Sequence, residues 1–407
     1  MVAIGDRVRR LCDAPGLRGA AGLGTRERYP PYNRMNSSRN RVEQELLFSS
    51  DSNALLMHKI RSLPKIDLHR HLTGSIDADM AARIGAKYEI PLPTYLSSEL
   101  DSILFGRRQA ATLEEYFTPW ETLNRLFSSR GATREIILEV IRKAADDNVI
   151  YVELRTGPHG FLGNGTYPFE EFLEIVASAT SEAEAKFGTK ARFIMGIPRH
   201  VFGRIPVDKR NRMCAQIISM LQPYRNECFV GVDLNGIETT AAMEDFAYCF
   251  QVAREQGFHV TAHAGECGPA ANVAYAVNVL KASRIGHGIA AAADPRVITD
   301  LLQKHCALEI CPTSNEFLGV VHGVGQLPLG VLQAQGVPFV ICTDNPARCK
   351  TSLSEELFKV SKAFSLSDSD LLHLTETALA FCFADFSTKE VLRARIDHFP
   401  AALSAEA

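Results

Sequence analysis

Short apolar runs alternate with longer segments of helical periodicity along the chain from Leu63 onward. Short runs rich in Val, Ile, Leu and Phe predict buried strands, whereas apolar residues spaced three and four apart predict helices with one apolar face. We identify candidate strands at residues 65–72, 150–157, 192–198, 229–236, 259–265, 283–289, 308–315 and 339–345. Segments between them, and the final stretch 368–392, are typical of helices. This alternation predicts an α/β fold with a parallel sheet, and the strand number is that of a (β/α)8 TIM barrel.

The first part of the chain lacks this pattern. Residues 1–57 are rich in Gly, Pro, Ser and Arg and have no sustained hydrophobic period, which predicts a disordered N-terminal extension ahead of a barrel at 58–407. An Arg-rich start is typical of an organelle transit peptide. Acidic residues interrupt it, however, and Met35 and Met57 offer later starts. An untargeted extension on a cytoplasmic protein therefore remains the main expectation.

Composition and charge narrow the class of partner. The chain of 407 residues is 46% hydrophobic and 22% charged, which is typical of a globular protein with a sizeable core. Its formal net charge of -3 gives no long-range attraction for nucleic acid or for an anionic membrane. No apolar run approaches the roughly 18 residues of a membrane span. We expect a small-molecule substrate and leave the oligomeric state open.

The ten cysteines show no C-x-x-C spacing, and several lie in apolar runs such as ALEICP and FVICTD. This distribution predicts buried, reduced thiols rather than a disulfide framework or a zinc site built from cysteines.

Polar residues gather at the ends of the candidate strands, where a barrel carries its active site. His69 and His71 end the first strand, and their spacing directs both imidazoles to one side while Arg70 points to the other. His287 ends the sixth strand between two glycines, and Asp344 ends the eighth. Each feature alone has a simpler explanation, such as a packed pair of histidines or an aspartate that caps a helix.

The segment His263-Ala264-Gly265-Glu266 follows the fifth strand, and Gly265 permits a turn that brings His263 and Glu266 into one pocket. A partly buried carboxylate beside an activated water suits a general acid or base, although Glu266 could instead cap the next helix. Considered together, the strand ends supply three imidazoles and one carboxylate. That donor set predicts a catalytic zinc site with a position left for water, formed by His69, His71, His263 and Asp344.

Seven segments, in order along the chain, resemble the adenosine deaminase family of metal-dependent hydrolases: LPKIDLHRHLTGSI, YVELRTGPH, GVDLNG, AHAGE, RIGHG, LEICPTSN and CTDNP. The resemblance implies a barrel of the metal-dependent hydrolase type that converts adenosine to inosine and ammonia. It implies one zinc ion per chain on the four donors named above. It further implies that Glu266 protonates purine nitrogen 1, that His287 orients or deprotonates the attacking water, and that the backbone of Gly236 donates to nitrogen 3.

Two positions depart from the vertebrate-type pattern. Thr73 stands where an aspartate holds the ribose 5′-hydroxyl, and Asn345 stands where an aspartate contacts purine nitrogen 7. A neutral residue at 73 removes a carboxylate that would repel phosphate, so the alternative substrate is a 5′-nucleotide such as N6-methyl-AMP. Four arginines are candidates for contacting that phosphate: Arg70, Arg107, Arg108 and Arg199. An amide at 345 can donate to nitrogen 7 without needing a proton of its own.

An apolar stripe lies between the first two strands, where the family has a helix that covers the pocket. Leu113, Tyr116, Phe117 and Trp120 have the spacing of one helix face. Such a stripe is either core or an apolar lid over the substrate, and the sequence leaves both possibilities open.

Two other classes of function agree less well with these residues. A catalytically silent barrel that only binds a nucleoside would need neither Glu266 nor His287, and both are present. A binuclear hydrolase of the phosphotriesterase type would use a carboxylated lysine at a strand end, and none of the candidate strands ends in Lys.

Overall fold

The structure is a computed structural model that describes residues 52–106, 113–161, 166–225 and 227–399, without the side chains of 113–117. The chain divides into two units, Met1–Ser62 and Leu63–Ala407. In the first unit residues 52–62 are helical, so regular structure begins inside the stretch 1–57 that the sequence predicts to be disordered. The rest of that prediction falls outside the described residues.

The second unit contains an eight-stranded parallel sheet with the strand order β1 to β8. The strands are β1 (Lys65–His71), β2 (Val149–Thr156), β3 (Lys190–Pro198), β4 (Phe229–Asn235), β5 (His259–Ala264), β6 (Arg284–His287), β7 (Ala307–Ile310) and β8 (Phe339–Ile341). Closure comes from a parallel bridge between Arg70 of β1 and Asp344, just beyond β8. The predicted (β/α)8 barrel is therefore confirmed, and it closes at Asp344, one of the predicted site residues.

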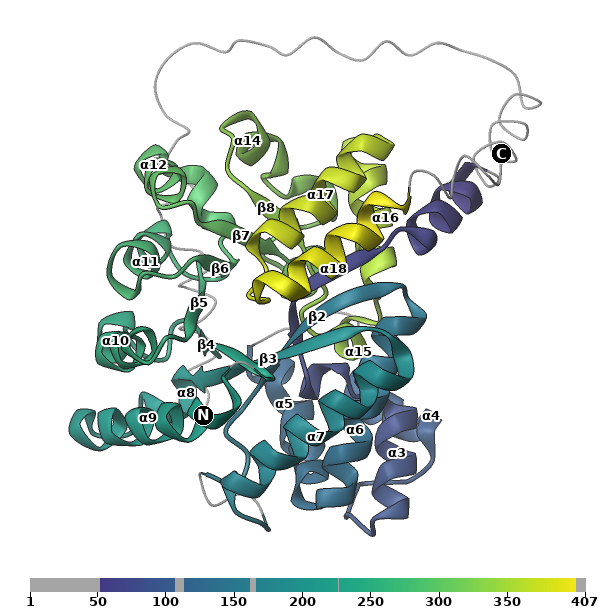
Figure 1. Cartoon of the computed structure of the whole chain (residues 1–407), viewed down its shortest axis with the longest axis vertical. Helices are drawn as coiled ribbons and strands as arrows, with labels where there is room; N and C mark the ends of the chain where they lie inside the picture. Colours follow the sequence, from purple (N-terminus) through teal and green to yellow (C-terminus); the bar gives the residue numbers. More distant parts are fainter. Residues whose placement is uncertain (1–51, 107–112, 162–165, 226, 400–407) are drawn as a thin grey trace. The chain divides into compact units, whose positions relative to one another are not determined.

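Helices lie outside the strands and follow one another around the barrel in sequence order (Figure 1). They are α3 (Ala78–Lys87), α4 (Ser97–Phe105), α5 (Leu113–Asn124), α6 (Arg130–Asp146), α7 (Phe169–Phe187), α8 (Arg199–Phe202), α9 (Val207–Leu221), α10 (Ala247–Glu255), α11 (Ala270–Tyr275), α12 (Pro295–Gln303), α13 (Pro312–Phe317), α14 (Leu329–Ala334), α15 (Pro346–Cys349), α16 (Leu353–Phe364), α17 (Asp368–Phe381) and α18 (Phe386–Asp397). Single helical turns occur at η1 (Thr73–Ser75), η2 (Arg125–Ser128), η3 (Gln222–Tyr224), η4 (Met243–Phe246), η5 (Ala276–Leu280), η6 (Ile289–Ala293) and η7 (Val324–Gln326).

The core lies between the sheet and these helices. In α6 the apolar residues Ile136, Ile137, Val140 and Ile141 are all fully buried, as their spacing predicts for a helix packed on a sheet. The C-terminal stretch forms two helices, α17 and α18, and buried residues of both contribute to one cluster with residues of β1, β2 and β8. They cover the seam where the barrel closes, and this packing stabilises the position of Asp344 beside β1.

Two further expectations concern the cysteines and membranes. Each cysteine in the described ranges is free, and Cys267 alone among these is half-exposed while the others are buried. In those same ranges, no helix is long and apolar enough to cross a membrane.

Candidate active site

A cavity of about 360 Å³ is lined by residues at the carboxyl ends of the strands. This is the end at which barrels carry their active sites. Its walls include His71, Thr156, Asn235, His263, His287 and Asp344. The strands thus bring residues separated by more than half of the chain to one cavity.

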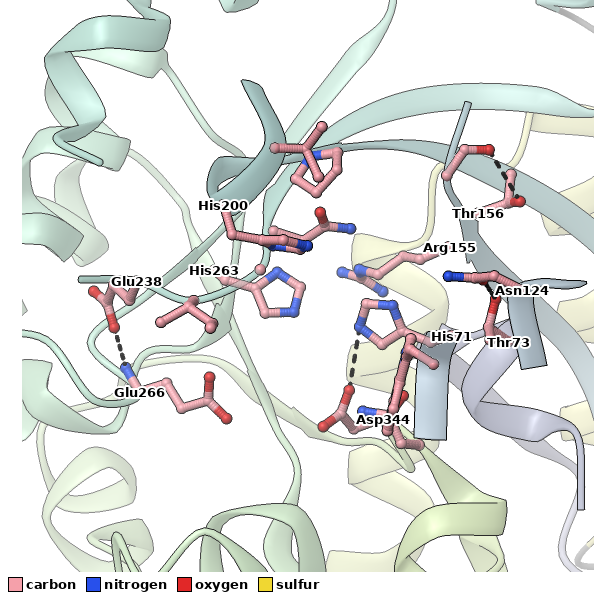
Figure 2. Close-up of a pocket in the computed structure, with 18 of the residues that line it drawn as sticks. His71, Thr73, Asn124, Arg155, Thr156, His200, Glu238, His263, Glu266 and Asp344 are labelled. Atoms are coloured by element: carbon pink, nitrogen blue, oxygen red, sulfur yellow. Dashed lines mark hydrogen bonds and ion pairs between the residues drawn. The ribbon is translucent and has the colours of Figure 1, made fainter. Parts of the chain in front are cut away.

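Four side chains in this region form a compact set of donors. One ligand atom from each of His69, His71, His263 and Asp344 lies within 4.8 Å of the other three. The Oδ1 atom of Asp344 is 3.2 Å from Nε2 of His71 and 3.4 Å from Nε2 of His69. Figure 2 shows His71 and Asp344 facing each other, with the ring of His263 beside them. Arg70, which lies between the two histidines of β1, donates instead through Nε to Ser75 Oγ at 3.0 Å.

Two carboxylates hold two of these histidines in place from the side away from the cluster. Glu309 Oε2 lies 2.8 Å from Nδ1 of His69, and Asp233 Oδ2 lies 3.1 Å from Nδ1 of His263. When a histidine donates from Nδ1 to a carboxylate, its Nε2 lone pair is left to bind a metal. In the described part of the chain, the buried Nε2 of His69 has no hydrogen-bond partner. The donor set and its bracing therefore fit a divalent cation such as zinc.

The bracing carboxylates belong to a fully buried network of charges inside the barrel. Glu309 pairs with Arg155 and, at 2.6 Å, with Arg284, while Arg155 also pairs with Asp233 at 3.2 Å. Arg284 is bound in addition by Glu153. Burial alone would raise the pKa of Glu309, but Arg155 and Arg284 hold it well below its usual range. Burial would likewise raise the pKa of Asp233, but His263 and Arg155 lower it.

Glu266 and His287 lie next to the donors. Glu266 Oε1 is 3.3 Å from Nε2 of His287, and both side chains come within 4.8 Å of an oxygen of Asp344. Burial, reinforced by the negative charges of Asp344 and Glu238, raises the pKa of Glu266 well above its usual value. Burial also lowers the pKa of His287, which is thus neutral. The pair can supply a protonated carboxyl and a neutral imidazole to one bound molecule.

The backbone at two of these residues is unusual. His287 has φ of 61° and Asp344 has φ of 59°, so both adopt the left-handed conformation that non-glycine residues rarely occupy. Neighbouring side chains hold them there: Ser314 donates to Asp344 Oδ2 at 2.6 Å, and Asn315 Nδ2 lies 3.2 Å from His287 Nδ1. Such strain is typical of functional sites, where the surrounding structure enforces it.

Three of the predicted substrate contacts, Gly236, Asn345 and Thr73, also line the cavity. Gly236 has φ of 83°, and a Cβ there would lie 2.6 Å from Nδ1 of His200, so any other residue at this position would be strained. Asn345 packs so tightly against Gly74 that an added Cβ on Gly74 would overlap its amide. The hydroxyl of Thr73 donates to Oδ1 of Asn124 at 3.2 Å.

The apolar stripe is only partly described. The backbone of α5 carries all four positions, but the side chains of Leu113, Tyr116 and Phe117 lie outside the described ones. Trp120 is half-buried and lines the cavity, as the lid interpretation requires at that position.

Several residues of the site were not found from the sequence. They are Glu309, Asp233, Ser314, Asn315, Asn124 and Glu238. For Glu309 and Asp233 a signal existed, because each is a charged residue inside an apolar strand. A charge in that position is costly to bury unless it is paired, so it predicts a partner even when the partner is unknown.

Comparison with known proteins agrees with this geometry. The family model described as adenosine deaminase matches residues 64–399. An adenosine deaminase of Enterococcus faecalis is 32% identical over 339 residues, which are 83% of this chain and 97% of the relative. An adenine deaminase of Rhodopseudomonas palustris is 30% identical over 346 residues, which are 84% of this chain and 96% of the relative.

Among solved structures, that of the N6-mAMP deaminase of Arabidopsis superposes with a TM-score of 0.71. It is 26% identical and the match covers 83% of this chain and 98% of the other. The three relatives act on a nucleoside, a free base and a nucleotide, by their names. All three are deaminases by name, but their substrates differ, so the comparisons indicate the type of reaction more clearly than the substrate.

Proposed function

Because the chain belongs to the adenosine deaminase family, a family of hydrolytic deaminases, we propose that it converts a 6-aminopurine nucleoside, adenosine, to inosine and ammonia. The observation that carries the proposal is the meeting of two sets of side chains in one cavity. One set is the four-donor cluster of His69, His71, His263 and Asp344, and the other is the neighbouring pair Glu266 and His287.

We propose that the four donors hold one zinc ion per chain. A zinc ion so held lowers the pKa of water toward about 7 and thereby supplies a nucleophile near neutral pH. The imidazoles of His69 and His263 are oriented for this by Glu309 and Asp233. Asp344 is oriented by the hydroxyl of Ser314.

Glu266 and His287 handle the protons in this proposal. Attack on carbon 6 of the purine would place negative charge on the ring unless nitrogen 1 is protonated at the same time. Glu266, whose raised pKa keeps it protonated, is the donor of that proton. His287 is neutral and lies 3.3 Å from Glu266, so it can orient the attacking water or accept its proton.

The purine ring is held by two further groups. The backbone N–H of Gly236 donates to nitrogen 3, a role supported by the place of Gly236 in the cavity wall. The amide of Asn345 donates to nitrogen 7, and its packing against Gly74 supports a fixed orientation for it. Leu113, Tyr116 and Phe117 would cover the ring from α5.

The choice of a nucleoside rests on the polar groups near Thr73. Its hydroxyl gives its proton to Asn124, so it offers a ligand only lone pairs, which suit a ribose 5′-hydroxyl and not a phosphate. Arg70 and Arg199 are buried and bound to Ser75 and to backbone carbonyls, respectively. Arg155 lines the cavity but is paired with two carboxylates. The remaining phosphate candidates, Arg107 and Arg108, lie outside the described residues.

The second candidate is deamination of a 5′-nucleotide such as N6-methyl-AMP. The observation that favours it is the neutral Thr73, together with the similarity to the Arabidopsis N6-mAMP deaminase. A non-catalytic nucleoside-binding barrel has no comparable support, since binding alone needs neither Glu266 nor His287.

A substrate panel separates these candidates. Purified protein would be assayed by absorbance with adenosine, 2′-deoxyadenosine, adenine, AMP and N6-methyl-AMP. We expect the highest kcat/KM with adenosine. A strong preference for either monophosphate would replace the nucleoside proposal with the nucleotide one, and no turnover of any purine would reject both.

A further inference from the structure

Glu238 makes an unusual set of hydrogen bonds in the wall of the cavity. It lies beyond the end of β4 and is almost completely buried. Its carboxylate oxygens accept from four consecutive backbone N–H groups, those of residues 265–268, at 2.7, 3.2, 3.2 and 2.8 Å. Nδ2 of Asn272 donates to the same carboxylate at 2.7 Å. One side chain thus holds every backbone donor of the loop that carries Glu266.

The loop is shaped to receive this carboxylate. Successive N–H groups that converge on one point form an anion-binding nest, which an ion or a carboxylate can fill. Gly265 supplies the positive φ of 66° that the turn needs. At Gly268 an added Cβ would overlap the carboxylate of Glu238, so only glycine permits the approach. The geometry of the loop and the position of Glu238 therefore depend on each other.

Arg199 ties the same two segments together a second time. Its Nη1 donates to the backbone carbonyl of Glu238 at 3.2 Å, and its Nη2 donates to the backbone carbonyl of His263. His263 is one of the four donors, so Arg199 connects the backbone at Glu238 to the backbone of the donor cluster. In Figure 2 Glu238 reaches the backbone nitrogen of Glu266 while the carboxyl of Glu266 points toward the cavity.

We infer that Glu238 is a positioning residue that fixes the 265–268 loop so that the carboxyl of Glu266 is aimed at the substrate. The inference rests on the proposed role of Glu266 as proton donor. A proton donor works only within hydrogen-bond reach of its target, and a displacement of about 1 Å can cost on the order of 100-fold in rate.

Two variants test the inference in the full-length, metal-loaded protein. Glu238→Gln keeps the size of the side chain but turns an amide NH2 toward backbone donors. Gly268→Ala leaves both carboxylates intact and pushes Glu238 out of the nest. For each we expect kcat to fall by roughly 10- to 100-fold, with KM for adenosine within a few-fold and metal content unchanged.

Glu184→Gln is the matched control. Glu184 also accepts a backbone N–H, from Ala191 at 3.0 Å, and binds Lys190 and Arg192, but it does so at the start of β3, far from the strand ends that form the cavity. We expect this variant to lower thermal stability and to leave kcat within a few-fold of wild type. If Glu184→Gln lost as much kcat as Glu238→Gln, both losses would be explained by lower stability, and the inference would be overturned.

Combination with Glu266→Gln separates positioning from other effects. If Glu238 acts through Glu266, then adding Glu238→Gln to Glu266→Gln lowers kcat by no more than a few-fold. Additive losses would overturn the inference, as would a wild-type kcat in both Glu238→Gln and Gly268→Ala. Near-normal turnover in Glu266→Gln alone would instead reject the proposed acid, which distinguishes failure of the proposed function from failure of this inference.

Discussion

The two ends of the cavity are built differently. At the end that would receive the 6-amino group, the side chains are charged residues or proposed metal donors. They lie at strand ends and are braced from inside the barrel, as His69 is by Glu309. At the other end Thr73 and its partner Asn124 are neutral, and they lie on the helical turn η1 and on α5. The difference indicates that the sheet fixes the chemistry, whereas elements outside the sheet decide which substrate is accepted.

The two ends also differ in how their side chains are held. A buried charge is stable only when it is paired, and the arginines inside the barrel pair the carboxylates that hold the histidines. Thr73 and Asn124 have no such support from the network in the part of the chain described. Substitutions at the two ends should therefore differ in kind, with loss of chemistry at one end and change of specificity at the other.

The largest effect is expected for Glu266→Gln. The amide cannot deliver a proton to nitrogen 1, so kcat should fall by on the order of 100- to 10,000-fold while the protein folds and keeps its metal. Steady-state kinetics with adenosine and metal analysis of the same sample check this. A kcat within a few-fold of wild type would assign the acid to another residue.

Next in size is Asp233→Asn, which weakens the brace behind His263. We expect the affinity for the metal to fall by about 10- to 100-fold, because an amide no longer orients the imidazole as a carboxylate does. Competition with a chelator of known affinity measures the metal affinity of the variant and of the wild type.

Glu153→Gln is its control within the network. Glu153 pairs with Arg284 and accepts from the hydroxyl of Tyr151 at 2.9 Å, but it contacts none of the four donors. Both variants should lose thermal stability, and only Asp233→Asn should lose metal affinity. Equal metal affinities in the two variants would show that the brace has no role at the metal.

A smaller effect is expected for Gly236→Ala, at the middle of the cavity. The added Cβ would crowd Nδ1 of His200 and strain a backbone at φ of 83°. We expect KM for adenosine to rise about tenfold, the equivalent of about 1.4 kcal/mol. Gly188→Ala is the control, since Gly188 has φ of 73° with nothing within 4 Å of an added Cβ. If both variants raise KM alike, backbone strain rather than the site is responsible.

The smallest effect on adenosine is expected for Thr73→Asp. A carboxylate there can accept from a ribose 5′-hydroxyl, so kcat/KM for adenosine should stay within a few-fold or improve, while any activity with AMP should fall through charge repulsion. Thr73→Asn, which adds no charge, is the control. A wild type that prefers AMP and loses that preference in Thr73→Asp but not in Thr73→Asn would show that this end binds a phosphate.

The sequence predicts the barrel and the donor set because both depend on local pattern. Each strand is a short apolar run, and His263 or Asp344 stands at the end of its run, where barrel geometry brings it to the shared face. The buried network of charges inside the barrel could not be predicted from local pattern. Glu309 and Arg155 are 154 positions apart, and nothing in either segment indicates the partner before the barrel closes. The hydrogen bonds from the 265–268 loop to Glu238 depend on the backbone angles of that loop. Gly265 and Gly268 are the only signs of those angles in the loop's sequence.

The central claim is that one metal ion at the strand ends serves hydrolytic deamination. The most direct test measures zinc per chain and adenosine turnover in the same preparation, before chelation, after chelation, and after zinc is restored. We predict about one zinc per chain, loss of turnover with the metal, and recovery with it. Full turnover in protein that contains no metal would contradict the account.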